Sequence, residues 1–215
     1  MALADRSPTP DSAELTPRSR WHGARMTLDE FLALPEEKPY LEYDNGVVLQ
    51  KDASSEVAPQ GDHGSIQVEF IIRFDRAGRQ RRLGKTFSET RFVTPGWAPV
   101  PDVSYYRRER IRPTSRRQIG DLHIPPDIAV EIVSPDQSVA ELLRKCLRYA
   151  EVGVAVSLIV DPNDVSIFVI RPGQALRVLR GDDRIDLDDV LPGLELTVAE
   201  LFASVVDDWL IESDE

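Results

Sequence analysis

The chain has 215 residues, of which 41% are hydrophobic and 29% charged, and its formal net charge is −11. This composition is typical of one ordinary folded domain, and no stretch approaches the roughly 20 apolar residues of a membrane-spanning helix. The first 20 residues lack the apolar segment of a signal peptide, so we expect a cytoplasmic protein. A single cysteine, Cys146, excludes an internal disulfide, and three scattered histidines make a zinc site unexpected, so carboxylates would have to hold any metal.

Charge is unevenly distributed along the chain. Between residues 73 and 117 there are 13 Lys and Arg against 4 Asp and Glu, whereas residues 182–215 carry 12 acids and one base. The basic segment is what a surface for nucleic-acid phosphates requires, although solvated surface charge explains it equally well. The acidic segment is alternatively a surface for another protein.

The N-terminal part of the chain predicts an arm, a short helix and a hairpin. Residues 1–25 are rich in Ser, Pro and Ala, which predicts a disordered arm before a domain at 26–206 and an acidic tail at 207–215. Thr27 and Glu30 form a capping box that opens a helix ending at Pro35. The pair Asn45-Gly46 within residues 40–50 favours a hairpin of two strands.

The remaining sequence predicts alternating strands and helices. Apolar spacing predicts a helix over 63–81, followed by strands at 85–94, 100–108 and 126–134, with an arginine-rich loop at 107–121 before the last of these. An amphipathic pattern predicts a helix at 136–153, and strands follow at 154–162 and 165–172. Residues 191–202 add a strand-like piece and a last helix. The order is helix, three antiparallel strands, helix and two strands.

The strand at 126–134 carries Glu131 within an apolar run, where an unpaired buried charge costs several kcal/mol. Side chains alternate across a strand, so Asp127 and Glu131 share the face opposite the apolar one. If the strand near Asp102 pairs antiparallel with this strand, Asp102 and Glu131 lie side by side. Two such carboxylates repel unless one is protonated or a cation lies between them, which predicts an Mg²⁺ site.

Lys145 lies 14 residues after Glu131 on the predicted helix at 136–153. Its ammonium could reach back over the sheet end, where it would hold a metal-bound water or offset developing negative charge. Spacing alone favours the alternative of a solvent-facing helix lysine.

Several segments together resemble a known family. They are PDVSYY, PPDIAVEIVSP, RKCLRYAEVGV, LIVDP and LPGLELTVAELF, and the resemblance runs from about residue 26 to 206. The chain resembles the Uma-two family of restriction endonuclease-like proteins, which is similar to the PD-(D/E)XK nucleases. The resemblance implies an α/β restriction endonuclease-like fold with an αβββαβ core, in which helices flank a mixed central sheet behind an N-terminal helix and hairpin.

The resemblance also implies a site that joins an Asp and a Glu on adjacent strands with a Lys. It assigns the catalytic roles to Asp102, Glu131 and Lys145, and the metal-binding role to the two acids. Val133 stands where the usual E-x-K lysine would be, and Lys145 on the following helix takes its place. Further candidates are His63, Glu89 and Glu42, for which surface or capping roles are the alternatives.

The end of the strand at 100–108 and the loop after it are candidates to contact a nucleic-acid backbone. The candidates are Tyr105, Tyr106, Arg107, Arg108, Arg110, Arg112, Arg116 and Arg117. A solvated loop is the alternative. Asp127 is expected to be structural, capping the entry of its strand.

The resemblance and the candidate metal site together imply a nuclease that depends on Mg²⁺ or Mn²⁺ and hydrolyses phosphodiester bonds in DNA. A homodimer is expected, because two sites related by a two-fold axis are the simplest way to cut both strands of a duplex. The alternative is a non-catalytic module that keeps the nuclease fold and binds nucleic acid or a protein partner.

Overall fold

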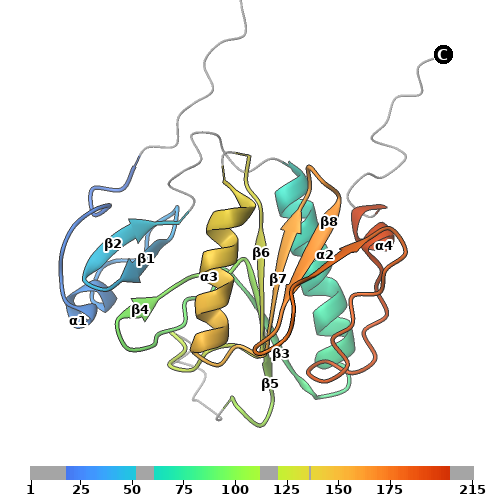
Figure 1. Cartoon of the computed structure of the whole chain (residues 1–215). Helices are drawn as coiled ribbons and strands as arrows, with labels where there is room; N and C mark the ends of the chain where they lie inside the picture. The colour runs from blue at the N-terminus through green and yellow to red at the C-terminus, as the bar shows by residue number, and fades with distance from the viewer. Residues whose placement is uncertain (1–17, 52–60, 112–120, 136, 204–215) are drawn as a thin grey trace, which may run out of the picture.

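The computed structural model describes residues 18–51, 61–111, 121–135 and 137–203, which form two β-sheets with helices packed around them (Figure 1). In chain order the elements are α1 (Leu28–Leu32), β1 (Leu41–Asp44), β2 (Val47–Gln50), α2 (Gly61–Gly78), β3 (Gly84–Ser88), β4 (Trp97–Ala98), β5 (Val103–Arg107), β6 (Ile128–Ile132), α3 (Val139–Glu151), β7 (Val156–Asp161), β8 (Ser166–Ile170), β9 (Arg177–Arg180) and α4 (Val198–Ala203).

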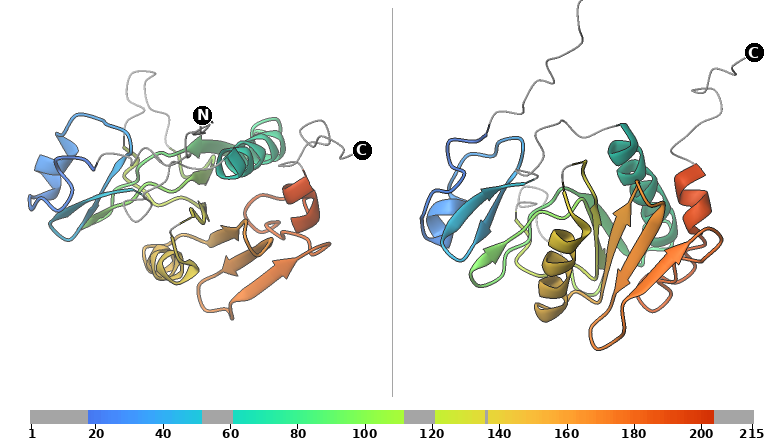
Figure 2. Two further views of the ribbon diagram at one scale, coloured as in Figure 1. Left: turned by 90° about the horizontal axis from the view of Figure 1, so that it is seen from above. Right: turned by 45° about the horizontal axis from the view of Figure 1, so that its top comes forward.

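The larger sheet has six strands in the order β3-β5-β6-β7-β8-β9. Strands β3, β5 and β6 are antiparallel neighbours, and α3 connects β6 to the parallel strand β7. Helices α2 and α3 cover opposite faces of this sheet, as the view from above in Figure 2 shows. The expected α/β class, the mixed sheet and the order αβββαβ are therefore confirmed.

Strand β6 shows how alternation builds the two faces. Ile128, Val130 and Ile132 are buried together with the apolar side chains of α2. Ala129 is buried on the other face, with the apolar side chains of α3. Glu131 has the same parity as Ala129, so it lies on the face that α3 covers.

The smaller sheet has the order β2-β1-β4. The hairpin between β1 and β2 turns at Asn45 and Gly46, whose φ values of 46° and 93° confirm the left-handed backbone that the pair predicts. Residues 18–25, which the expected arm included, lie against this hairpin. The Gly23 N–H donates to the Val48 carbonyl at 2.8 Å, so packed structure begins before residue 26.

Several elements differ from the sequence prediction, among them β4, which was not predicted. The strand expected at 85–94 ends at Ser88, because Glu89 has a φ of 42° and turns the chain away. Strand β9 was not predicted, since Leu179 alone among its residues is buried and the alternation is weak. The strand-like piece expected from residue 191 contributes an isolated bridge between Arg184 and Thr197.

Some expectations lie outside the described residues, among them the acidic tail at 207–215. Within the described ranges, no helix combines the length and the apolar character needed to cross a membrane.

Candidate active site

Asp102 and Glu131 lie opposite each other where β5 and β6 run side by side. Val103 pairs with Val130 in the antiparallel ladder, and one further step in the same register sets Asp102 against Glu131. The Ile132 N–H donates to Asp102 Oδ2 at 2.6 Å. Both carboxylates are buried. The structure thus brings the two acids together by the antiparallel pairing that the sequence predicted.

Asp102 is held by cationic and polar donors. Lys51 Nζ lies 2.6 Å from its Oδ1, and His63 Nε2 lies 3.5 Å from its Oδ2. Burial raises the pKa of Asp102, but the Lys51 ammonium and His63 outweigh burial and hold this pKa well below its usual range. The main-chain oxygen of Asp102 accepts a hydrogen bond from Gln67 Nε2 at 2.9 Å, so the residue is fixed at both ends.

Glu131 has different neighbours. The Tyr149 hydroxyl donates to its Oε1 at 2.5 Å, and Lys145 Nζ lies 3.1 Å from the same oxygen. Burial raises the pKa of Glu131 to about 7, an increase that Lys145 opposes and Asp102 reinforces. The charge of Asp102 therefore disfavours the ionised form of Glu131 across the strand pair.

Lys145 lies over the sheet and not on the solvent-facing side of α3. Its Nζ contacts Glu42 Oε1 at 2.8 Å as well as Glu131. Burial lowers the pKa of Lys145, but the two glutamates more than reverse this effect and raise the pKa above its usual value. Lys145 therefore carries a positive charge in the cluster.

The smaller sheet positions Glu42 against α3. Glu42 Oε1 also accepts a hydrogen bond from the Val100 N–H at 2.8 Å. Two residues along β1, Asp44 pairs with Arg148 at 2.7 Å, and the Arg148 guanidinium lies 4.2 Å from the Trp97 ring centroid. Two ion pairs, spaced by two residues on the strand and three on the helix, thus hold the sheet beside Lys145.

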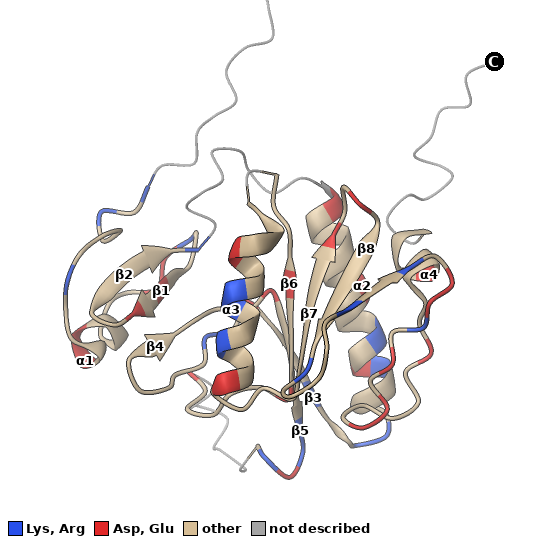
Figure 3. Cartoon of the chain, in the orientation of Figure 1, with Lys and Arg blue, Asp and Glu red and all other residues tan. Residues whose placement is uncertain are grey.

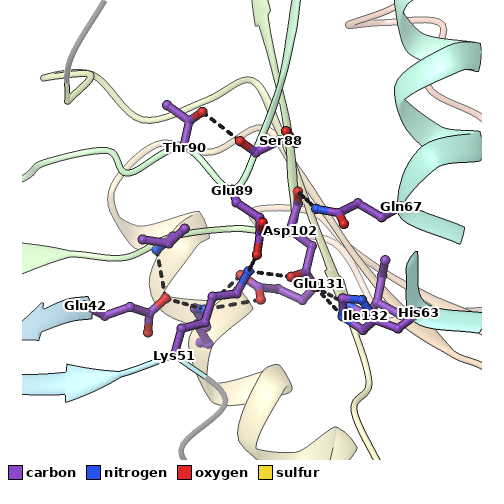
Figure 4. A network of polar contacts seen from close by, with 12 residues as sticks. Glu42, Lys51, His63, Gln67, Ser88, Glu89, Thr90, Asp102, Glu131 and Ile132 are labelled. Carbon is purple, nitrogen blue, oxygen red and sulfur yellow. Dashed lines mark hydrogen bonds and ion pairs between the residues drawn. The ribbon is translucent and has the colours of Figure 1, made fainter. Parts of the chain in front are cut away.

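Glu89 lies at the more open side of this cluster. Its N–H donates to the Asp102 carbonyl at 3.1 Å, and its Oε1 lies 3.5 Å from Lys51 Nζ. Figure 4 shows the Lys51 ammonium between Glu89 and Asp102. The Glu89 side chain is 33% exposed, whereas that of Asp102 is 3% exposed, so solvent reaches the cluster from this side.

Two members of the cluster, Lys51 and Tyr149, had no role in the sequence prediction. Lys51 follows β2 and is 51 residues from Asp102 in the chain, and no local pattern marks it. The position of Tyr149 could have been predicted, because it lies one helical turn after Lys145 and therefore on the same side of α3.

Asp127 and its arginines form a separate buried ion pair. Asp127 Oδ1 accepts hydrogen bonds from Arg107 Nε at 2.8 Å and Arg110 Nη1 at 3.0 Å, and Oδ2 accepts one from the Arg107 N–H. These contacts agree with the structural role expected for Asp127. They also engage two of the arginines that were candidates for a nucleic-acid backbone.

The other candidates for backbone contacts divide into three groups. Arg108 is exposed, and Arg112, Arg116 and Arg117 lie outside the described residues. Tyr105 and Tyr106 are fully buried, so the prediction that they contact nucleic acid was wrong. Further arginines lie in the C-terminal half of α2 (Figure 3), where Arg73 is paired with Glu69 at 2.6 Å.

The described donor set fits a hard divalent ion with few protein ligands. Across the ranges that the structure describes, no group of three or more His, Cys, Asp or Glu side chains is arranged to hold a metal ion. A site of two carboxylates still suits Mg²⁺, which is commonly held by one or two carboxylates and completes its shell with water and substrate phosphates. Asp102 and Glu131 are the adjacent carboxylates that could hold an ion in this way.

Comparisons with known proteins identify the class of fold and then the family. The chain is similar to a protein of known crystal structure from Anabaena variabilis, described as "a putative nuclease belonging to DUF820". The two are 32% identical with a TM-score of 0.75, over 84% of this chain and 99% of that one, so the restriction endonuclease-like fold expected from the sequence is confirmed.

A family model described as "Uma2: Putative restriction endonuclease" matches residues 28–199. The chain therefore belongs to the Uma2 family, as its motifs indicated. No curated protein matches the chain.

Proposed function

We propose that this protein is a metal-dependent nuclease that hydrolyses phosphodiester bonds in DNA. The observation that carries this proposal is the meeting of Asp102 and Glu131, from adjacent strands, in a buried cluster with Lys145. Membership of the Uma2 family supports nuclease activity. The metal and the DNA substrate are proposed from the chemistry of the cluster.

Asp102 and Glu131 would hold Mg²⁺ or Mn²⁺. When bound, such an ion lowers the pKa of a coordinated water and stabilises negative charge on phosphate oxygens. Lys145 is a positively charged donor beside Glu131, suited to orient a water molecule or to offset charge that develops on the phosphate. Tyr149 fixes the orientation of Glu131 through its hydroxyl hydrogen bond.

The experiment is a cleavage assay of the purified full chain. Supercoiled plasmid and labelled oligonucleotides are incubated with Mg²⁺ or Mn²⁺ and with the wild type, Asp102→Ala or Glu131→Ala. We expect cutting by the wild type and by Asp182→Ala, a control that removes an exposed carboxylate, and none by the other two variants. If all four preparations cut alike, the activity is a contaminant and the assignment fails.

The substrate arms of the same assay test the choice of DNA. Matched RNA and single-stranded oligonucleotides are compared with duplex DNA, and the proposal expects duplex DNA to be cut fastest. If only RNA is cut, the metal centre stands and the DNA assignment is wrong. If nothing is cut while DNA binds, the chain is a non-catalytic module.

We also propose a homodimer as the working form, because a two-fold axis presents one site to each strand of a duplex. Light scattering at the assay concentration measures this directly. A monomer that still makes double-strand breaks would contradict it.

A further inference from the structure

Lys51 is a buried cation at the centre of the candidate site. Its side chain is 4% exposed, and its Nζ lies 2.6 Å from Asp102 Oδ1 and 3.5 Å from Glu89 Oε1. It follows β2 of the smaller sheet, whereas Glu89 and Asp102 lie next to β3 and β5 of the larger one (Figure 4). This ammonium touches one of the two acids to which the proposed function assigns the metal.

The cluster contains four carboxylates and two ammonium groups. Lys145 contacts Glu42 and Glu131, whereas Lys51 contacts Asp102 and Glu89. Each lysine therefore pairs with two of the four carboxylates. Because an uncompensated buried carboxylate is costly, the Lys51 ammonium stabilises Asp102 whenever no other cation is bound.

A divalent ion held by Asp102 would compete with Lys51 for Oδ1, the oxygen that Lys51 contacts. Mg²⁺ coordinates oxygen at about 2.1 Å, which is closer than the Lys51 ammonium lies to Asp102 Oδ1. The other oxygen, Oδ2, already accepts the Ile132 N–H at 2.6 Å. Two cations on one buried carboxylate repel strongly because little solvent screens them.

We propose that Lys51 is a resident cation that competes with the divalent ion for Asp102, so that metal binding requires its ammonium to leave Asp102. This inference rests on the proposed function. Glu89 is the partner that receives the displaced ammonium, because it lies within 3.5 Å of Lys51 on the more exposed side of the cluster. Lys51 thereby lowers the affinity of the site for metal and stabilises the metal-free fold.

The first test compares metal affinity without measuring catalysis. Lys51→Gln keeps a polar donor but removes the positive charge, and Lys85→Gln makes the same charge change at an exposed position. Mn²⁺ is titrated into each protein, and the free ion is followed by electron paramagnetic resonance. We expect Lys51→Gln to bind Mn²⁺ about tenfold more tightly than the wild type, because a repelling charge is removed, and Lys85→Gln to match the wild type. Equal or weaker binding by Lys51→Gln overturns the inference.

The second test uses the wild type, so it does not depend on the folding of a variant. Lysines are acylated with an amine-reactive reagent with and without Mn²⁺, and the modified peptides are quantified by mass spectrometry. We expect Mn²⁺ to accelerate modification of Lys51 and to leave that of Lys85 unchanged. Protection of Lys51 that persists with Mn²⁺ bound overturns the inference alone, whereas an absence of Mn²⁺ binding to both wild type and Lys51→Gln overturns the proposed metal centre itself.

Discussion

The buried carboxylates near β6 form two groups, Asp127 alone and the pair Asp102 and Glu131, and their partners differ. Asp127, just before the strand, is bound by Arg107 and Arg110, whereas Glu131 and the adjacent Asp102 are bound by lysines and a tyrosine hydroxyl. A guanidinium matches a carboxylate with a rigid, planar set of donors, while an ammonium sits on a flexible stem. Burial alone therefore does not mark a functional acid, and we propose that the cationic partner decides whether the carboxylate can exchange it for a metal.

The largest difference between the two groups is expected in catalysis. Glu131→Gln replaces the carboxylate by an amide of the same shape and removes a proposed metal ligand. We expect the initial rate of DNA cleavage to fall by at least about 100-fold, since even residues outside the first coordination shell are commonly worth 10- to 100-fold. Circular dichroism checks that the variant is folded, and a folded variant with the wild-type rate would remove Glu131 from the site.

For Asp127→Asn we expect a loss of stability and no change in metal affinity. This change removes the charge of a fully buried carboxylate, so the free energy of unfolding should fall by about 3 kcal/mol, the lower end of the usual range because both arginine partners are partly exposed. Urea denaturation measures the loss. Mn²⁺ affinity should remain that of the wild type, and its loss would show that the two groups are not separate.

Tyr149→Phe should have an intermediate effect on the site. Removal of the hydroxyl that donates to Glu131 Oε1 is expected to slow cleavage by about tenfold, because Glu131 loses the partner that orients it. Tyr106→Phe is the matched control, since its hydroxyl also lies in the interior but donates to the Ile124 carbonyl at 3.4 Å, away from the cluster. Equal cleavage rates for the two variants would argue against a positioning role for Tyr149.

The smallest effect concerns the start of α3, the helix that carries Lys145. Ser138 and Glu141 form a capping box, and Ser138→Ala should lower the free energy of unfolding by about 1 kcal/mol with little change in cleavage rate. Hydrogen bonds from the backbone and hydroxyl of Ser138 lower the pKa of Glu141 below its usual 4.5.

A pKa that is lower in the folded state contributes stability above the unfolded value, and this contribution is lost as the pH falls through the folded value. The difference in stability between wild type and Ser138→Ala should therefore shrink below pH 4.5. Denaturant unfolding at neutral and acidic pH measures it. A difference that grows on acidification would contradict the assigned cap.

The part of the site that could be predicted from the sequence depends on local rules. Asp102 and Glu131 belong to strands that follow each other in the chain, so alternation and antiparallel pairing suffice to align them. Lys145 required the family resemblance, because its spacing alone favoured a solvent-facing position. The capping boxes and the Asn45-Gly46 turn likewise follow from short motifs.

The rest depends on how distant segments pack. Lys51 reaches Asp102 only because the smaller sheet lies against α3, a contact that no local pattern describes. Tyr105 and Tyr106 read as an exposed strand end, but they are consecutive on a strand that is buried on both faces, so each side chain enters the interior. Residue identity therefore predicted the strand, and packing decided its exposure.

The most direct test of the central claim is Mn²⁺ binding measured by calorimetry on wild type, Glu131→Gln and Asp127→Asn. We expect one binding event in the wild type and in Asp127→Asn, and none in Glu131→Gln, because the carboxylates of β5 and β6 are proposed to share the ion. Unchanged binding by Glu131→Gln would contradict that claim, since the ion would then be held elsewhere.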